Sequence, residues 1–315
     1  SKHSAVSYER AGKVIAQLEL EVQQLLAKAE QADATPLQDG LTIPEEITRR
    51  QERKAALAQA RAEIEARAHA RYTAQLAEHE QKLAARAAKK ERGEKVGGKP
   101  PEAPTPTPQP GDQYNFTDPE SRIMKAGNGN HFEQSYNAQA VVEVESRLIL
   151  GERVSQAPND KQELVPTLVA IPVIAGPVAA ALVDSGFFSA AAVAQIEQSA
   201  APTRTLVYAA VEKTGHHRSV ADLEVKPDPV PPGPAASVQE VMRYRLKTPA
   251  GKALYKLRQQ TVEPVFGIIK SVLGFRQFQL RGRAKVSAEW TLVCLAYNLK
   301  RLHRLGAGLK LVETN

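Results

Sequence analysis

At 315 residues the chain is long enough for one large domain or two ordinary ones, and it carries 42 Lys or Arg against 35 Asp or Glu. A hydrophobic content of 42% with 5% aromatic residues is typical of a globular protein with an alanine-rich core. The single cysteine, Cys294, excludes an internal disulfide framework and predicts a buried thiol in a reducing cytoplasm. No apolar run reaches the length of a membrane span, so we expect no membrane partner.

Residues 1–90 are predicted to form a helical hairpin. From residue 4 to about 33, Ile15, Leu18, Val22 and Leu25 recur at helical spacing and make a narrow apolar seam. Turn residues follow, and the stretch to residue 90 is rich in Ala, Glu and Arg with almost no Gly or Pro. A solvated helical insertion and a specific oligomerisation element fit this composition equally well.

Residues 91–117 are predicted to form a linker. Prolines and glycines are dense in this stretch, which favours extended backbone and cannot build a packed core.

From residue 118 the pattern changes to that of a mixed α/β core, which we assign to residues 118–305. Two β-branched runs predict a hairpin, and a later, wholly apolar run predicts a central strand that ends at Asp184. A proline-rich insertion at 211–240 and a tail at 306–315 complete the chain. The predicted elements are strands at 136–144, 148–154, 178–183 and 205–209, and helices at 162–173 and, capped by Ser189, at 190–198.

The basic charge is confined to the C-terminal quarter. Between Val241 and Lys310 there are fifteen Lys or Arg against two acids, Glu263 and Glu289, which is a net charge of +13 in a chain whose total is +7. Such clustering is the electrostatic footprint of a polyanion partner. Glu263, inside this field, is either the partner of a structural ion pair or a metal ligand close to phosphate.

Lys256, Glu263 and Lys270 are seven residues apart and share one helical face. Pro264 interrupts the pattern, because it cannot donate to the carbonyl of Gln260. Either the helix is kinked at this proline, or a new helix begins there with Thr261 or Glu263 near its cap.

The stretch from Tyr255 to Lys270 resembles the C-terminal catalytic motif of DDE transposases from bacterial insertion sequences. Two residues separate Tyr255 from Arg258 and six separate Glu263 from Lys270, as in that family, but four rather than three separate Arg258 from Glu263. Further resembling stretches occur in the same order along the chain, at residues 118–125, 136–139, 158–163 and 183–189.

The resemblance implies a ribonuclease-H-like mixed sheet flanked by helices, in which Asp184 is the second catalytic, metal-binding acid and Glu263 the third. It implies Mg²⁺ or Mn²⁺ as the cofactor, and double-stranded DNA of the element ends and the target as the partner, bound by a homo-oligomer. The residues that would contact this DNA are Tyr255, Lys256, Arg258 and Lys270.

Phosphodiester cleavage needs hard divalent ions, because charge grows on the attacking and leaving oxygens together. Carboxylates are the matching ligands, and ligands in α/β sheets lie beyond the carboxyl ends of strands, where Asp184 is expected. Without the resemblance, Asp184 in Asp-Ser-Gly would be interpreted as the cap of an ordinary turn.

The first acid of the family is expected on a strand upstream of residue 1, since Asp118 and Asp160 do not match its motif. We therefore expect a truncated copy of a transposase, located in the bacterial cytoplasm and on the nucleoid. The alternatives are an inactive DNA-binding remnant, and a coiled-coil assembly protein whose basic tail binds nucleic acid through phosphates.

Overall fold

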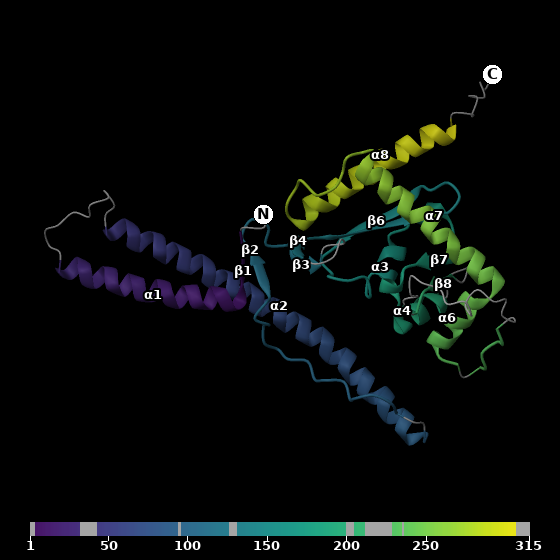
Figure 1. Cartoon of the computed structure of the whole chain (residues 1–315), viewed down its shortest axis with the longest axis horizontal. Helices are drawn as coiled ribbons and strands as arrows, with labels where there is room; N and C mark the ends of the chain where they lie inside the picture. The colour runs from purple at the N-terminus through teal and green to yellow at the C-terminus, as the bar shows by residue number, and fades with distance from the viewer. Residues whose placement is uncertain are drawn as a thin grey trace, which may run out of the picture. The chain divides into compact units, whose positions relative to one another are not determined.

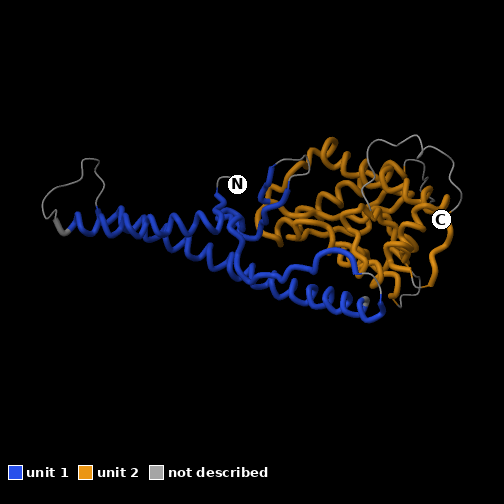
Figure 2. The backbone as a smooth tube through the Cα atoms, turned by 60° about the horizontal axis from the view of Figure 1, so that its bottom comes forward, with its two compact units in different colours: residues 1–126, 130–134 blue, residues 127–129, 135–315 orange. Residues whose placement is uncertain are grey.

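The computed structural model describes residues 4–31, 43–93, 96–125, 131–199, 205–211, 229–234 and 236–306 (Figure 1). This part of the chain contains seven α-helices and four two-stranded sheets, so the expected mixed α/β class is confirmed. The chain divides into two compact units, residues 1–126 with 130–134 and residues 127–129 with 135–315 (Figure 2).

The first unit is built around a hairpin of two helices, α1 (Tyr8–Gln31) and α2 (Ile43–Glu91). Their direction is antiparallel, because Tyr8 donates to Glu65 at 2.7 Å, whereas Lys54 pairs with Glu19 at 2.9 Å. The seam between the helices contains Leu18, as the periodicity predicted, together with the buried residues Ala11, Leu57 and Ala60. The turn predicted between the helices lies outside the described residues.

Two short sheets are formed almost entirely by residues of the first unit. Strand β1 (Ala5–Ser7) pairs antiparallel with β2 (Gln113–Asn115), and β3 (Arg122–Lys125) pairs with β4 (Phe132–Ser135). The prediction of a helix from residue 4 was therefore wrong for the first residues. Three residues hold too little periodicity to reveal a strand whose partner follows more than a hundred residues later.

The second unit contains two strand pairs of opposite type. Strand β5 (Asn137–Val142) runs antiparallel to β6 (Ile149–Ser155), with a register irregularity between Val141 and Val142. Strand β7 (Ala180–Val183) runs parallel to β8 (Leu206–Ala209). No strand of the described residues joins the two pairs, so a single ribonuclease-H-like sheet stays a prediction.

Five helices accompany these strands. Ser189 caps α4 (Ala190–Glu197) as predicted, and its side chain accepts a hydrogen bond from the Ala192 amide. Helix α3 (Leu164–Val169) is shorter than predicted, and the residues Val173–Ala175 form a separate 3₁₀ turn, η2, after Pro172. The C-terminal helices are α6 (Val238–Lys247), α7 (Pro249–Ser271) and α8 (Arg283–Gly306).

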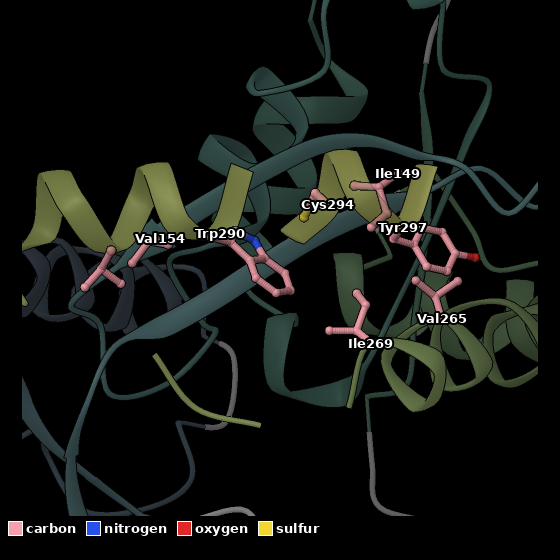
Figure 3. Packing of buried hydrophobic residues seen from close by; sticks show 8 residues of the cluster. Ile149, Val154, Val265, Ile269, Trp290, Cys294 and Tyr297 are labelled. Carbon is pink, nitrogen blue, oxygen red and sulfur yellow. The ribbon is translucent and has the colours of Figure 1, made fainter. Parts of the chain in front are cut away.

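The main core of this unit lies where α7 and α8 pack on β5 and β6 (Figure 3). Trp290 and Tyr297 of α8 are 2% exposed, and the Trp290 indole N–H donates to the Gln139 carbonyl at 2.9 Å. Asn298 accepts from the Ile149 amide at 2.8 Å and donates to the Ile149 carbonyl at 2.7 Å. Cys294 is buried in the same core as Trp290 and Tyr297, as expected from the apolar run in which it lies.

A second core joins α4, β8 and α6 around Val193, Val207 and Met242. At its edge the Arg245 guanidinium donates to both carboxylate oxygens of Glu197, at 2.5 and 3.1 Å, and to the Val207 carbonyl. Glu197 also accepts from the Val207 amide at 3.0 Å, so the three groups form one buried polar network.

Candidate active site

Asp184 follows the last residue of β7, at the carboxyl end of a parallel strand. Its side chain accepts from the Ser185 amide at 2.8 Å and caps η3, the 3₁₀ turn Ser185–Phe187. The turn-cap interpretation of Asp-Ser-Gly is therefore confirmed. The side chain is nevertheless 61% exposed, which leaves a carboxylate accessible at the edge where α/β folds bind ligands.

Two predicted site residues of α7 meet the end of β7. The Arg258 guanidinium lies 3.9 Å from the Asp184 carboxylate and 5.7 Å from the centre of the Tyr255 ring. The Tyr255 hydroxyl donates to the Val183 carbonyl at 3.1 Å. Burial raises the pKa of Tyr255, so the phenol keeps the proton that this hydrogen bond uses. Asp184, Arg258 and Tyr255 thus form one cluster, although 70 residues lie between Asp184 and Tyr255 along the chain.

The other three predicted site residues lie on a different face of α7. Lys256, Glu263 and Lys270 are all exposed, in agreement with their seven-residue spacing. Glu263 follows Arg258 by five residues, which places it about 140° further around the helix. The structure brings Arg258 to Asp184 but shows no interaction between Asp184 and Glu263, so a shared metal site of these two acids stays a prediction.

Pro264 lies inside a continuous helix. Helix α7 begins after Thr248, whose side chain accepts from the Gly251 amide, and it runs to Ser271. The alternative in which a new helix starts at the proline was wrong. The Thr261 hydroxyl donates to the Leu257 carbonyl at 2.6 Å, about one turn before Pro264, whose nitrogen carries no hydrogen to donate. Glu263 is therefore held on a helix rather than on an irregular segment.

An apolar pocket of about 240 Å³ lies beside the cluster, between β5 and β7. Consecutive residues line it on both sides, Gln139–Val142 of β5 and Ala180–Val183 of β7. Successive side chains of a strand point to opposite faces, so a pocket that contacts them all lies along the strand edges. Two buried polar atoms of pocket residues, Thr167 Oγ1 and Arg258 Nε, have no hydrogen-bond partner among the described residues.

Residues 228–303 match the family model of the transposase DDE domain. This stretch is therefore similar to the DDE domain of transposases, and we call it the DDE segment. The match confirms the resemblance for less than half of the chain, and it contains Tyr255, Arg258 and Glu263 but not Asp184. A comparison with curated proteins gave no match, and a comparison with solved structures gave none either.

The DDE segment exposes many of its basic residues. Buried residues of α7 and α8 pack on the strands, while cations of α6, α7 and α8 lie on the surface of these three successive helices. Clustered exposed cations of this kind are typical of surfaces that bind polyanions. The exposed cations of the matched helices are Arg243 and Lys247 of α6, Lys252, Lys256 and Lys270 of α7, and Arg283, Lys285, Lys300 and Arg304 of α8 (the matched range ends at residue 303, one before Arg304).

A third acid, Asp160, lies next to the Asp184 turn. Its carboxylate accepts from Asn137 at 2.8 Å and from Gln139 at 2.7 Å. Its second oxygen lies 3.5 Å from the position that a Cβ on Gly186 would occupy. The stretches at 136–139 and 158–163 resembled the family, but sequence reasoning did not connect them. The available signal was the spacing of Asn137 and Gln139, because residues two apart on a strand share one face and can bind the same carboxylate.

The described residues contain no group of three or more His, Cys, Asp or Glu side chains placed to hold a metal ion. Asp184 supplies a carboxylate of the kind that Mg²⁺ prefers, and Mg²⁺ often takes only one or two protein carboxylates. The donor chemistry at the end of β7 therefore fits such an ion, while a complete ligand set stays a prediction. Within the described part of the chain, every helix is too short or too polar to cross a membrane.

Proposed function

We propose that the chain acts as a DNA transposase of an insertion sequence, which hydrolyses phosphodiester bonds and transfers the freed strand. The cluster of Asp184, Arg258 and Tyr255 carries this proposal. It joins the carboxyl end of a parallel strand, where an acid is exposed, to the helix that lies inside the matched DDE segment.

In this proposal Asp184 and Glu263 would hold Mg²⁺ or Mn²⁺, which would supply a Lewis acid for the attacking water and for the charge on the reacting phosphate. Arg258 is close enough to Asp184 to neutralise part of its charge and to bind a phosphate oxygen beside it. Tyr255 holds the backbone at Val183 and so fixes the position of Asp184. Lys256 and Lys270, exposed along α7, bind phosphates of the DNA strand.

The pocket between β5 and β7 supports the ribonuclease-H-like part of the proposal. Strand edges with unpaired backbone groups are unfavourable when buried in an apolar environment. One further strand in this pocket would pair with both edges and join the antiparallel and parallel pairs into one mixed sheet. Apart from Gln139, the strand residues that line the pocket on either side are apolar, which suits a strand covered on both faces.

A second candidate is DNA binding without cleavage. It is favoured by the exposed position of Glu263, on a face of α7 away from Arg258. Metal binding decides between the two functions, because only the transposase needs both acids at one ion.

The test measures Mn²⁺ binding by calorimetry and electron paramagnetic resonance, with Asp184→Asn, Glu263→Gln and the control Glu102→Gln, an exposed acid outside the second unit. The transposase proposal expects each site variant to weaken Mn²⁺ binding about tenfold or more, as lost metal ligands do. The control should bind as the parent does. Equal Mn²⁺ affinity in all four proteins would refute the metal site.

Duplex DNA binding is measured in parallel at several salt concentrations. If the protein contacts DNA phosphates, its affinity for DNA should fall steeply as salt is added. This salt dependence should be weaker in Lys256→Gln/Lys270→Gln and unchanged in Lys99→Gln. DNA binding with this salt dependence but without Mn²⁺ binding would support the second candidate.

A further inference from the structure

Helix α8 carries an apolar seam that nothing in the described part of the chain covers. Its inner face, with Trp290, Cys294 and Tyr297, packs into the main core of the second unit. Its outer face carries Ala288 and then four leucines that follow at steps of four, three, four and three positions. All five positions are exposed, and the leucines retain large accessible fractions: Leu292 66%, Leu295 52%, Leu299 59% and Leu302 50%.

The spacing identifies the kind of surface that fits this seam. Alternation of three and four residues is the heptad pattern by which one helix inserts its side chains between those of another. Leucine at each of four successive positions, with Leu305 beside them, suits a partner helix and not a flat or polar surface. Isolated exposed leucines are ordinary, but five apolar positions in register along one helix face are not.

The charges around the seam favour a second copy of the same helix. The six positions that flank the seam hold no Lys or Arg, although α8 is otherwise strongly basic. The cations Lys300, Arg301 and Arg304 stand at positions away from the seam, so two copies would not bring them together across it. The flanking residues are Glu289, Thr291, Ala296, Asn298, His303 and Leu305.

We propose that α8 pairs with α8 of a second copy of this chain, in antiparallel orientation, through the leucine seam. Lys285 lies one heptad before Leu292, at a seam position. Parallel helices would face Lys285 with its own copy, whereas antiparallel helices place the two lysines at opposite ends of the pair. In the antiparallel arrangement Leu292 faces Leu302 of the partner subunit, and Leu295 faces Leu299 of the partner subunit.

The test is sedimentation equilibrium of the full chain, treated with nuclease and measured in high salt so that no nucleic acid bridges two copies. The chain has a mass of 34.2 kDa, so the dimer is expected at twice this value. Leu295→Lys/Leu299→Lys should raise the dissociation constant about 100-fold, because it replaces the centre of the seam by charge. Val173→Lys is the matched control, since Val173 is 97% exposed and lies outside the seam.

Circular dichroism checks that each variant is folded, and Leu299→Ala, expected to weaken the dimer about tenfold, replaces the double variant if that one unfolds. Orientation is tested by mixing Leu292→Cys with Leu302→Cys under oxidation. Cross-linking in the mixture and not in either variant alone supports antiparallel pairing, and cross-linking of Leu292→Cys to itself overturns the orientation. A monomer at about 100 µM, or a dimer unchanged by the lysines, overturns the interface.

Discussion

Replacing Arg245 by Met should destabilise the second unit strongly, because it leaves Glu197 charged in a buried position. The two side chains are 14% and 10% exposed, and Arg245 supplies two of the hydrogen bonds to the Glu197 carboxylate. After the substitution the carboxylate keeps the 3.0 Å hydrogen bond from the Val207 amide. Met preserves the apolar stem of Arg245, so the change isolates the lost charge and hydrogen bonds.

The expected cost is about 3–5 kcal/mol, the range found when one partner of a buried ion pair is removed. For a unit of this size, that corresponds to a fall in melting temperature of roughly 6–20 °C. The double variant Arg245→Met/Glu197→Met also removes the carboxylate that has lost its two hydrogen bonds from Arg245. It should therefore be more stable than Arg245→Met alone by about 1 kcal/mol or more, although Val207 loses both of its partners in the network.

Urea unfolding measures these differences, with Trp290 as the probe, since it is the only tryptophan of the chain. Circular dichroism of the same samples reports the helices. Arg243→Met is the matched control: it makes the same chemical change at an exposed position of the same helix and should cost about 0.5 kcal/mol or less. The reasoning is refuted if Arg245→Met costs no more than this control, or if the double variant is less stable than the single one.

Three further predictions concern the same unit. Gly251→Ala should lower the melting temperature markedly, because the added Cβ would lie 1.9 Å from the Arg245 carbonyl oxygen and the close approach of α6 and α7 would have to open. Asn298→Leu should cost about 2–4 kcal/mol in urea unfolding and speed hydrogen exchange at the Ile149 amide, since both backbone groups of Ile149 lose their partner. Burial raises the pKa of the Cys294 thiol from 9.0 to about 12. The protonated thiol therefore contributes fully to stability below pH 9.0, the unfolded value, and this contribution is lost as the pH rises towards about 12. Urea midpoints measured between these two pH values should fall less steeply with pH in Cys294→Ala than in the parent.

Local patterns in the sequence predicted much of the second unit. The apolar run that ends at Asp184 is β7, and Ser189 caps the helix that follows. The seven-residue spacing of Lys256, Glu263 and Lys270 correctly indicated one shared helix face. These features depend on neighbours within one or two turns of a helix or a few residues of a strand, and such short-range preferences are visible in a single sequence.

Contacts between distant segments could not be predicted in the same way. Nothing local to Asp160 shows that its carboxylate meets the amides of Asn137 and Gln139 and lies beside Gly186. The proline at 264 left open either a kink or a new helix start, and tertiary packing of α7 keeps the helix continuous through it. Candidate site residues were therefore identified from motifs, while their grouping required the fold.

The hydrogen bond from Tyr255 to Val183 has a mechanical consequence. It attaches the N-terminal third of α7 to the backbone immediately before Asp184, and Arg258, one turn further along, approaches the acid itself. A displacement of α7 therefore reaches the backbone next to Asp184 through one hydrogen bond, from Tyr255 to the Val183 carbonyl. A ligand that shifts this part of α7 would therefore also shift the backbone that carries the Asp184 carboxylate.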